Sequence, residues 1–469
     1  MPLPSGASRH CCIFAASLLI SLTGCMAERS FPVRSDGVVR LSADGGGSGM
    51  PPREWLAVAQ TQLAPLLPAD DPAPLLTDDL ATTSGNARDV YRHFGVRGDR
   101  MHTLIWNLEG IQHTAQVAQQ KKIDVPPAWD EFNDVWIPVS DKVQLSGRLG
   151  LARDAAGARF ADCIVVLPGI LGDKSIMRTR DICFALREAG HHVLALDLRG
   201  LGQTRVRHPE IYSTFGALET GELLAVSTWL EAKSYVRDTG LIGFCWGANQ
   251  ALLAAWEDGR RDDDPCVGDA IRPFLRPRDG RRHFAAGMIA YSPVMRFEEI
   301  VATSARPTAI WINPVLNGLQ KRVIEHMQER GYPDPVGCLR DLFRAEILRS
   351  EFAEFDRVEE DGLRYVRLMP YQGKTACDKL EAARMPVLMV HAVNDPLAAA
   401  QDVADFVAQV DNPNVAAMIL AGGGHDGFAP YAGDHFYSLM LNFFDKSYGA
   451  AASLERLRHD TSKLAAAGR

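Results

Sequence analysis

The sequence predicts an α/β fold in which a mostly parallel sheet of eight strands is covered by helices on both faces. Between residues 131 and 447, short apolar runs alternate with longer stretches of helical periodicity. Runs such as Cys163–Leu167 and Val415–Leu420 are apolar along their whole length, which is typical of strands buried on both faces. The first two runs flank Ser140-Asp141-Lys142 and have the spacing of a hairpin.

Eight runs have this strand character: Val135–Val139, Val143–Leu149, Cys163–Leu167, His192–Leu196, Gly240–Gly243, Phe284–Tyr291, Val387–His391 and Val415–Leu420. Helical patterns at Ile176–Ala189, Leu218–Ala232 and Ala248–Glu257 separate the central ones. Between residues 294 and 385 the alternation gives way to helical patterns alone. An insertion after the sixth strand would cover the carboxyl edge of the sheet, so we expect a helical lid there.

Three further segments lie outside this domain. Residues 51–130 have an irregular helical pattern and are expected to form an N-terminal helical extension packed on the domain. Residues 26–50 are polar and end in a glycine-rich run, which is typical of a flexible tether. Residues 448–469 are expected to form an exposed C-terminal tail.

The N-terminus has the features of an export signal. Arg9 and His10 precede an apolar run, Ile13–Leu22, that is too short to span a bilayer. The run ends in Leu-Thr-Gly-Cys25, which resembles a bacterial lipobox. We therefore interpret residues 1–25 as a lipoprotein signal peptide and expect Cys25 to carry the lipid that anchors an exported protein to a membrane of the cell envelope. A plain signal peptide and a buried helix of a cytosolic protein are the alternatives.

Composition and charge exclude several classes of partner. The 469 residues are 46% hydrophobic with a formal net charge of −8, and no basic run is visible, so a nucleic-acid partner is not expected. No repeat of fixed period occurs, which argues against a solenoid or a propeller. No cluster of His, Cys and Asp has the spacing of metal ligands, so neither a metal nor a cofactor is expected. The sequence does not indicate an oligomeric state.

A glycine-flanked cysteine follows the fifth predicted strand. Gly243-Phe-Cys245-Trp-Gly247 has the spacing of a turn that carries a nucleophile, in which the flanking glycines let strand and helix approach closely. Cys245 would then stand at the N-terminus of the next helix, a position that favours the thiolate. By itself the pattern fits a buried cysteine at an ordinary strand-to-helix turn better than a nucleophile.

Two later strands are followed by a carboxylate and by a histidine. Asp395 lies just past the strand that ends at His391, and His425 lies on a glycine-rich loop after the last strand. We predict that these side chains complete a triad with Cys245. The alternative for Asp395 is a turn that caps the next helix. His435 is the fallback base, and His391 is expected to be a core histidine.

The loop after the third strand has the place of an oxyanion hole. Leu167-Pro-Gly-Ile170-Leu-Gly follows that strand, and the backbone N–H groups of Ile170 and Trp246 are expected to donate to a developing oxyanion. A helix-entry turn without catalytic function explains the same residues.

Taken together, these motifs resemble the α/β-hydrolase superfamily, in which nucleophile, acid and histidine follow one another in this order. More narrowly, residues 130–447 resemble the family-4 branch of esterases and alcohol acyltransferases. The matching segments are Gly169–Gly172, Asp197–Gly200 with Gly202, Gly243–Asn249, Asn394–Leu397 and Gly423–Phe428. The resemblance implies the α/β-hydrolase fold and the triad Cys245, Asp395 and His425.

Two residues depart from the family-4 pattern. Cys245 stands where that branch usually has serine, and a cysteine there resembles dienelactone hydrolases. Pro168 stands where a histidine usually precedes the glycine of the oxyanion hole. The function expected is an acyl hydrolase for a small-molecule ester, thioester or lactone that works through a thioacyl intermediate. An acyltransferase with the same triad, an inactive binding or scaffold protein of the cell envelope, a redox-sensing thiol and a peptidase are the alternatives.

Overall fold

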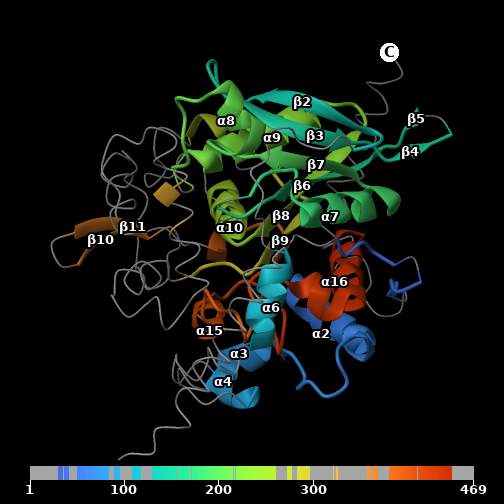
Figure 1. Cartoon of the computed structure of the whole chain (residues 1–469), viewed down its shortest axis with the longest axis vertical. Helices are drawn as coiled ribbons and strands as arrows, with labels where there is room; N and C mark the ends of the chain where they lie inside the picture. Colours follow the sequence, from blue (N-terminus) through green and yellow to red (C-terminus); the bar gives the residue numbers. More distant parts are fainter. Residues whose placement is uncertain are drawn as a thin grey trace, which may run out of the picture.

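The central sheet has nine strands, and eight of them are the apolar runs of the sequence (Figure 1). These eight are β2 (Phe132–Pro138), β3 (Gln144–Gly150), β6 (Ala161–Leu167), β7 (His192–Asp197), β8 (Val236–Phe244), β9 (Gly287–Tyr291), β12 (Val387–Ala392) and β13 (Val415–Leu420). The ninth is β1 (Leu75–Leu76), which pairs antiparallel with the edge of β13. The strand order is β1-β13-β12-β9-β8-β6-β7-β3-β2.

The computed structural model describes part of the chain. Apart from short gaps, the described residues are 30–83, 89–95, 108–117, 129–259, 282–295 and 380–445, with a few short pieces between 272 and 367. The predicted signal peptide with Cys25, most of the lid at 294–385 and the tail at 448–469 lie outside them. None of the helices among these residues is long and apolar enough to cross a bilayer.

The six inner strands β6, β7, β8, β9, β12 and β13 run parallel, whereas β2 and β3 form the predicted antiparallel hairpin. Every residue of β6, β7, β12 and β13 is buried. The predicted mostly parallel α/β fold, with a sheet covered on both faces, is therefore confirmed. Because parallel strands end at one edge of the sheet, the residues that follow β8, β12 and β13 are brought to the same side.

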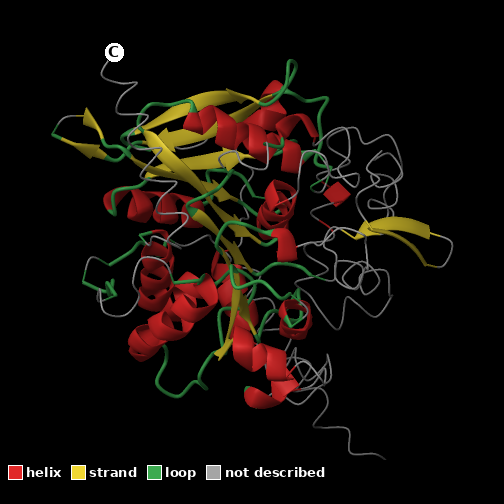
Figure 2. Cartoon of the chain, turned by 180° about the vertical axis from the view of Figure 1, so that it is seen from behind, coloured by secondary structure: helices red, strands yellow, loops and turns green. Residues whose placement is uncertain are grey.

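Helices cover both faces of the sheet (Figures 1 and 2). One face packs against α2 (Pro52–Leu63), α7 (Met177–Glu188) and α16 (Phe428–Phe444). The other packs against α9 (Glu219–Glu231), α10 (Trp246–Gly259) and α15 (Ala400–Val407). Alternate residues of β6 supply the two cores: Ile164 and Val166 face the first set of helices, and Cys163 and Val165 face the second.

The remaining elements are short. They are η2 (Ala64–Leu66), α3 (Thr77–Thr83), α4 (Asp89–His93), α6 (Leu108–Val117), β4 (Arg153–Asp154), β5 (Gly157–Ala158), α8 (Gly202–Arg207), η3 (Arg272–Phe274), β10 (Asp356–Glu360), β11 (Leu363–Arg367) and η4 (Leu380–Ala382). Within the N-terminal extension, Trp55 and Leu63 of α2 are fully buried, and the Trp55 ring meets Phe443 of α16 edge-on at 5.7 Å. Strand β1 comes from the same extension, so this extension adds a strand to the sheet as well as helices.

Three expectations differ from the structure. The segment predicted as a flexible tether packs on the domain over its described part, where the Phe31 N–H donates to Asp181 Oδ2 at 2.7 Å and the Val39 N–H donates to Ser438 Oγ at 2.9 Å. Strand β9 begins at Gly287 and not at Phe284, because Phe284 (φ 51°) and Gly287 (φ 98°) have left-handed backbones that form a turn. The expectation of an all-helical lid is wrong over 356–367, where β10 and β11 form an antiparallel pair. The sequence carries a signal for that pair, since Asp361-Gly362 is a dipeptide typical of hairpin turns.

Candidate active site

Cys245 stands on a sharp turn between β8 and α10. Its φ of 53° lies in the left-handed region, which a residue other than glycine rarely adopts, and its N–H donates to Tyr291 O at 3.0 Å. A Cβ on Gly243 would lie 2.2 Å from the carbonyl oxygen of Gly247, so strand and helix touch here backbone to backbone. The glycine spacing in the sequence thus has the steric role that the nucleophile turn requires.

The loop after β6 lies directly against Cys245. A Cβ on Gly169 would be 3.2 Å from Cys245 Cβ and 3.7 Å from its Sγ. Ile170 is half-buried beside it, and Trp246, at the start of α10, is buried. The loop therefore has the position expected of an oxyanion hole, and donation by the N–H groups of Ile170 and Trp246 stays a prediction.

His425 and Asp395 form a buried hydrogen-bonded pair. The His425 Nδ1 atom is 2.8 Å from Asp395 Oδ2. The other carboxylate oxygen, Oδ1, accepts hydrogen bonds from the N–H groups of Leu397 and Ala398 at 2.7 and 3.0 Å. One oxygen of Asp395 thus makes the predicted turn and the other bonds the imidazole, while the role of Asp395 in a triad stays a prediction.

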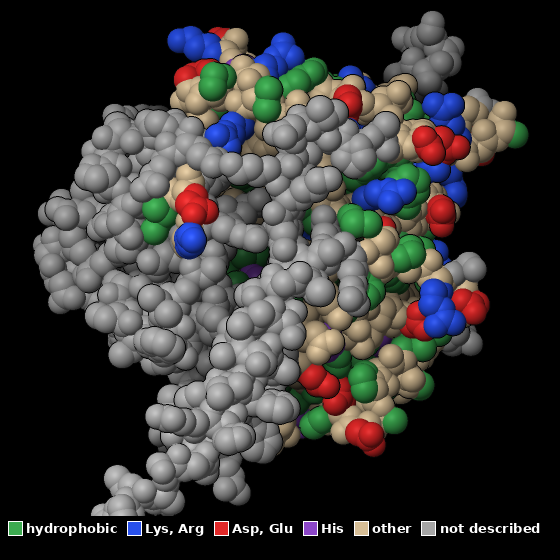
Figure 3. Space-filling view, in the orientation of Figure 1, with side chains coloured by type: hydrophobic (Ala, Val, Ile, Leu, Met, Phe, Trp, Pro, Cys, Tyr) green, Lys and Arg blue, Asp and Glu red, His purple; other side chains and the backbone are tan. Residues whose placement is uncertain are grey.

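The thiol and the imidazole meet at the carboxyl edge of the sheet. Cys245 Sγ, a ring nitrogen of His425 and a carboxylate oxygen of Asp426 all lie within 4.8 Å of one another. Residues 180 positions apart are thereby brought together. Figure 3 shows a small group of hydrophobic and histidine side chains near the centre of this face of the molecule.

The match to known families extends over most of this domain. Residues 164–434, more than half of the chain, match the model of the alpha/beta hydrolase family. This chain belongs to the alpha/beta hydrolase family. Searching the curated protein sequences finds no match.

Several solved structures resemble this hydrolase. One is an esterase of Pyrococcus furiosus, with 18% identity and a TM-score of 0.42 over 68% of this chain and 97% of that chain. Another is Est1E from Butyrivibrio proteoclasticus, with 15% identity and a TM-score of 0.39 over 67% of this chain and 99% of that chain. A third is the acylaminoacyl peptidase of Pyrococcus horikoshii, with 15% identity and a TM-score of 0.40 over 68% of this chain and 42% of that chain.

The charges around the hydrolase's histidine oppose the effect of its burial. Burial lowers the pKa of His425, but the negative charge of Asp395, followed by those of Cys245 and Asp426, outweighs burial and raises this pKa well above its ordinary value. Burial likewise raises the pKa of Asp395, and the charge and hydrogen bond of His425 outweigh it and lower that pKa. Both shifts thus favour the charged form of the group concerned.

The N-terminal extension holds the histidine loop in place, which the sequence did not indicate. Thr114 Oγ1 on α6 accepts the N–H of His425 at 2.8 Å and donates to Gly110 O at 2.6 Å. A Cβ on Gly424, whose φ is 56°, would lie 2.1 Å from Gly110 O, so α6 packs directly on this loop. Asn394 Oδ1 accepts the N–H of Gly424 at 2.8 Å and ties the acid loop to the histidine loop.

We expect Thr114→Val to lower kcat by about 10- to 100-fold with little change in KM, because a displacement of catalytic groups by about 1 Å has effects of this size. Valine has the same shape but leaves the buried N–H of His425 without an acceptor. Steady-state kinetics on an ester substrate measure the effect. Thr114→Ser should restore activity, and Thr61→Val is the matched control, since the exposed Thr61 hydroxyl also bonds a carbonyl four residues earlier. An unchanged kcat in Thr114→Val would contradict a positioning role.

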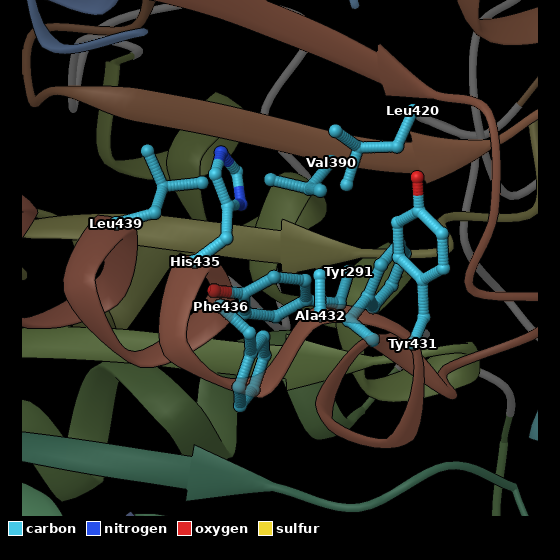
Figure 4. A pocket seen from close by; sticks show the side chains of 9 residues that line it. Tyr291, Val390, Leu420, Tyr431, Ala432, His435, Phe436 and Leu439 are labelled. Atoms are coloured by element: carbon cyan, nitrogen blue, oxygen red, sulfur yellow. The ribbon is translucent and has the colours of Figure 1, made fainter. Parts of the chain in front are cut away.

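The two other histidines considered for the site have different environments. His435, the fallback base, lies on α16 with Nε2 3.0 Å from Gln60 Oε1, and burial lowers its pKa to about 4. It lines a small pocket beneath β12 and β13, with Tyr431 on the opposite side (Figure 4). This pocket belongs to the core on the other face of the sheet from Cys245, so His435 is not placed to serve the thiol.

His391 is buried within β12, as expected of a core histidine. Its Nε2 is 3.1 Å from Ala398 O and 3.5 Å from Asp395 Oδ2, and burial lowers its pKa. A neutral ring at this position donates to the backbone carbonyl and leaves the Asp395 carboxylate to His425. His391 therefore supports the turn that carries Asp395.

Proposed function

We propose that this protein is an esterase-type acyl hydrolase that acts through Cys245, His425 and Asp395 and through a covalent thioacyl intermediate. The observation that carries the proposal is the convergence of a thiol on a left-handed turn with an imidazole whose other nitrogen is fixed by a buried carboxylate. The substrate class is a small-molecule ester, thioester or lactone.

The reaction would begin with attack of the Cys245 thiolate on the carbonyl carbon. The carbonyl electron pair moves to oxygen, and the N–H groups of Ile170 and Trp246 would stabilise that charge by about 3 kcal/mol each. Collapse expels the alcohol, which takes its proton from His425. A water molecule that His425 deprotonates then attacks the thioacyl carbon, and the thiolate of Cys245 leaves as the acid product forms.

His425 has the free atom that this cycle needs. Its Nε2 is buried and makes no hydrogen bond within the described structure, while Nδ1 bonds Asp395. Asp395 thereby fixes the orientation of the ring and stabilises its protonated form. The fixed nitrogen and the free nitrogen match the two roles that a triad histidine has.

In this proposal, the nucleophile and the other motifs point to two different branches of the family. A cysteine at the turn is a dienelactone-hydrolase-like feature on a chain whose other motifs resemble family 4. A thioacyl intermediate also transfers its acyl group to alcohols, so acyl transfer on the same triad is the nearest alternative. Export and lipid anchoring through Cys25, which the N-terminal sequence predicts, would place the site in the cell envelope.

A panel of p-nitrophenyl esters of increasing chain length tests the proposal on wild type, Cys245→Ala and Cys245→Ser. We expect Cys245→Ala to lose about 10⁴- to 10⁶-fold in kcat/KM, because loss of the nucleophile removes both covalent steps. Cys183→Ala is the matched control, since Cys183 is also a buried free thiol but lies in the other core. Full activity in Cys245→Ala would show that the catalytic assignment is wrong.

Two further measurements separate the alternatives. Product analysis with and without an added alcohol distinguishes hydrolysis from acyl transfer. For an active site, iodoacetamide should alkylate Cys245 rapidly at pH 7, and His425→Ala should abolish that rapid reaction. Alkylation no faster than that of an ordinary surface thiol would instead favour an inactive binding or scaffold protein.

A further inference from the structure

Asp426 places a second carboxylate beside the thiol, and the proposed hydrolysis gives it no role. Its oxygen lies within 4.8 Å of Cys245 Sγ and of a ring nitrogen of His425. The three residues are 9%, 5% and 7% exposed for Cys245, His425 and Asp426. In the described part of the chain, no other group of three histidine, cysteine or acidic residues has donor atoms within this distance of one another.

In both His425 and Asp426, one polar side-chain atom is bound to another residue and the other makes no hydrogen bond in the described structure. His425 Nδ1 bonds Asp395, and Asp426 Oδ2 pairs with Arg178 at 3.2 Å. Their remaining atoms, His425 Nε2 and Asp426 Oδ1, are buried and make no hydrogen bond in the described structure. A carboxylate that orients a metal-binding imidazole through its other nitrogen is the usual outer partner of a metal-bound histidine, and Arg178 is placed to orient Asp426 in the same way.

The backbone holds the ligand set in place. Cys245 and Asp426 have left-handed φ values of 53° and 69°, and the Asp426 N–H donates to Ser292 Oγ at 3.0 Å. Arg178 also reaches the Asp426 carbonyl oxygen at 3.4 Å, and its guanidinium stacks 3.9 Å from the centre of the Phe244 ring. Zinc–ligand bonds of about 2.0–2.3 Å put tetrahedral ligand atoms roughly 3.3–3.8 Å apart, and the donor atoms of these three residues already lie within 4.8 Å of one another.

The chemistry of the donors selects the metal. One thiolate, one imidazole and one carboxylate suit Zn²⁺, whereas Mg²⁺ and Ca²⁺ require oxygen ligands. Three protein ligands leave the fourth tetrahedral position for water. We propose that Cys245, His425 and Asp426 form a Zn²⁺ site, and that Zn²⁺ bound there blocks the nucleophile and inhibits the hydrolase. The inhibition rests on the proposed function, whereas the binding does not.

Cobalt spectroscopy tests the binding on the full chain. The metal-free protein is titrated with Co²⁺, which reports a bound thiolate by a near-ultraviolet charge-transfer band, and Zn²⁺ is then added. We expect one equivalent of Co²⁺ to produce the band, Zn²⁺ to remove it, and Cys245→Ser to lack it. Asp426→Asn should weaken Zn²⁺ binding by about 100-fold or more, since loss of an outer partner alone costs 10- to 100-fold.

Two controls define the result. Asp411→Asn changes an exposed carboxylate and Cys183→Ala removes another buried thiol, and both should bind Co²⁺ as wild type does. Because Asp426→Asn also removes the ion pair with Arg178, circular dichroism must show that it is folded, and the Cys245→Ser result stands independently of that pair. A band that persists in Cys245→Ser, or equal Zn²⁺ affinity in Asp426→Asn and wild type, would overturn the site.

Activity measurements separate this proposal from the proposed function. Zn²⁺ should inhibit ester hydrolysis by wild type, and EDTA should restore it. A cobalt band in a protein without esterase activity would support the metal site and contradict the hydrolase proposal. Cys245-dependent hydrolysis without a cobalt band would support the hydrolase proposal and contradict the metal site. Stimulation of hydrolysis by Zn²⁺ would contradict the proposed inhibition.

Discussion

Asp395→Asn should lower kcat/KM for ester hydrolysis by about 10⁴-fold without unfolding the protein, as the equivalent change does in Ser–His–Asp enzymes. The asparagine oxygen can keep the two hydrogen bonds from Leu397 and Ala398, so the turn survives. The amide nitrogen then replaces the oxygen that accepts from His425 Nδ1, and the imidazole turns its acceptor nitrogen toward it. Steady-state kinetics with a p-nitrophenyl ester measure the loss, and Asp411→Asn controls for removal of a carboxylate.

The same substitution should change the pH dependence in a defined direction. Asp395 is the charge that contributes most to the raised pKa of His425, so the protonated imidazole persists to higher pH in wild type than in a free histidine. The raised pKa stabilises the fold below the unfolded value of about 6.5, and this contribution is lost as pH rises through the folded value. In Asp395→Asn the alkaline limb of kcat/KM should therefore move to lower pH. An unchanged limb together with unchanged activity would contradict the role of Asp395.

Lys174→Met should lower the free energy of unfolding by about 3–5 kcal/mol, the usual cost of leaving one member of a buried ion pair without its partner. Lys174 and Asp197 are each 1% exposed, and Nζ donates to Asp197 Oδ2 at 2.6 Å and to Ser146 Oγ at 2.7 Å. Methionine fills similar space but leaves the buried Asp197 carboxylate without a positively charged partner. Urea unfolding followed by circular dichroism measures the change.

An exposed ion pair provides the control for Lys174. The side chains of Arg34 and Asp36 are 68% and 76% exposed and 3.4 Å apart, so Arg34→Met should change stability by no more than about 0.5 kcal/mol. Equal effects of the two substitutions would show that the buried pair is not a special determinant of stability. Asp197 also accepts the backbone N–H groups of Lys174 and Gln203. The pair therefore anchors the loop beside Cys245, and Lys174→Met should also lower the activity of the molecules that remain folded.

Local signals in the sequence predicted eight of the nine strands of the sheet and the three residues proposed as a triad. Inner strands such as β6, β12 and β13 could be predicted because burial on two faces requires apolar residues along the strand, whereas β2 and β3 were predicted from the hairpin turn between them. The turn at Cys245 was visible because only glycine at 243 and 247 lets β8 and α10 approach so closely. Asp395 and His425 were found because each follows a strand whose carboxyl end lies at the same edge of the sheet.

Contacts between distant segments were decided only by the tertiary structure. Strand β1 is two residues long and has no periodicity to read, so the ninth strand depends wholly on its pairing with β13. Thr114 is 311 residues from His425, and the sequence of its helix has no feature that marks it as a support for the histidine loop. Spacing likewise gave no sign of the group formed by Cys245, His425 and Asp426, because 180 residues separate its thiol from its imidazole.

The sequence by itself thus determined which residues form strands and which reactive side chains stand at the ends of those strands, because both depend on burial and backbone geometry within a few neighbouring residues. The tertiary structure decided which partners hold these side chains and that His425 Nε2 and Asp426 Oδ1 make no hydrogen bond in the described structure. Hydrogen bonding and packing between segments far apart in the chain depend on how the whole chain folds, and no local pattern records them.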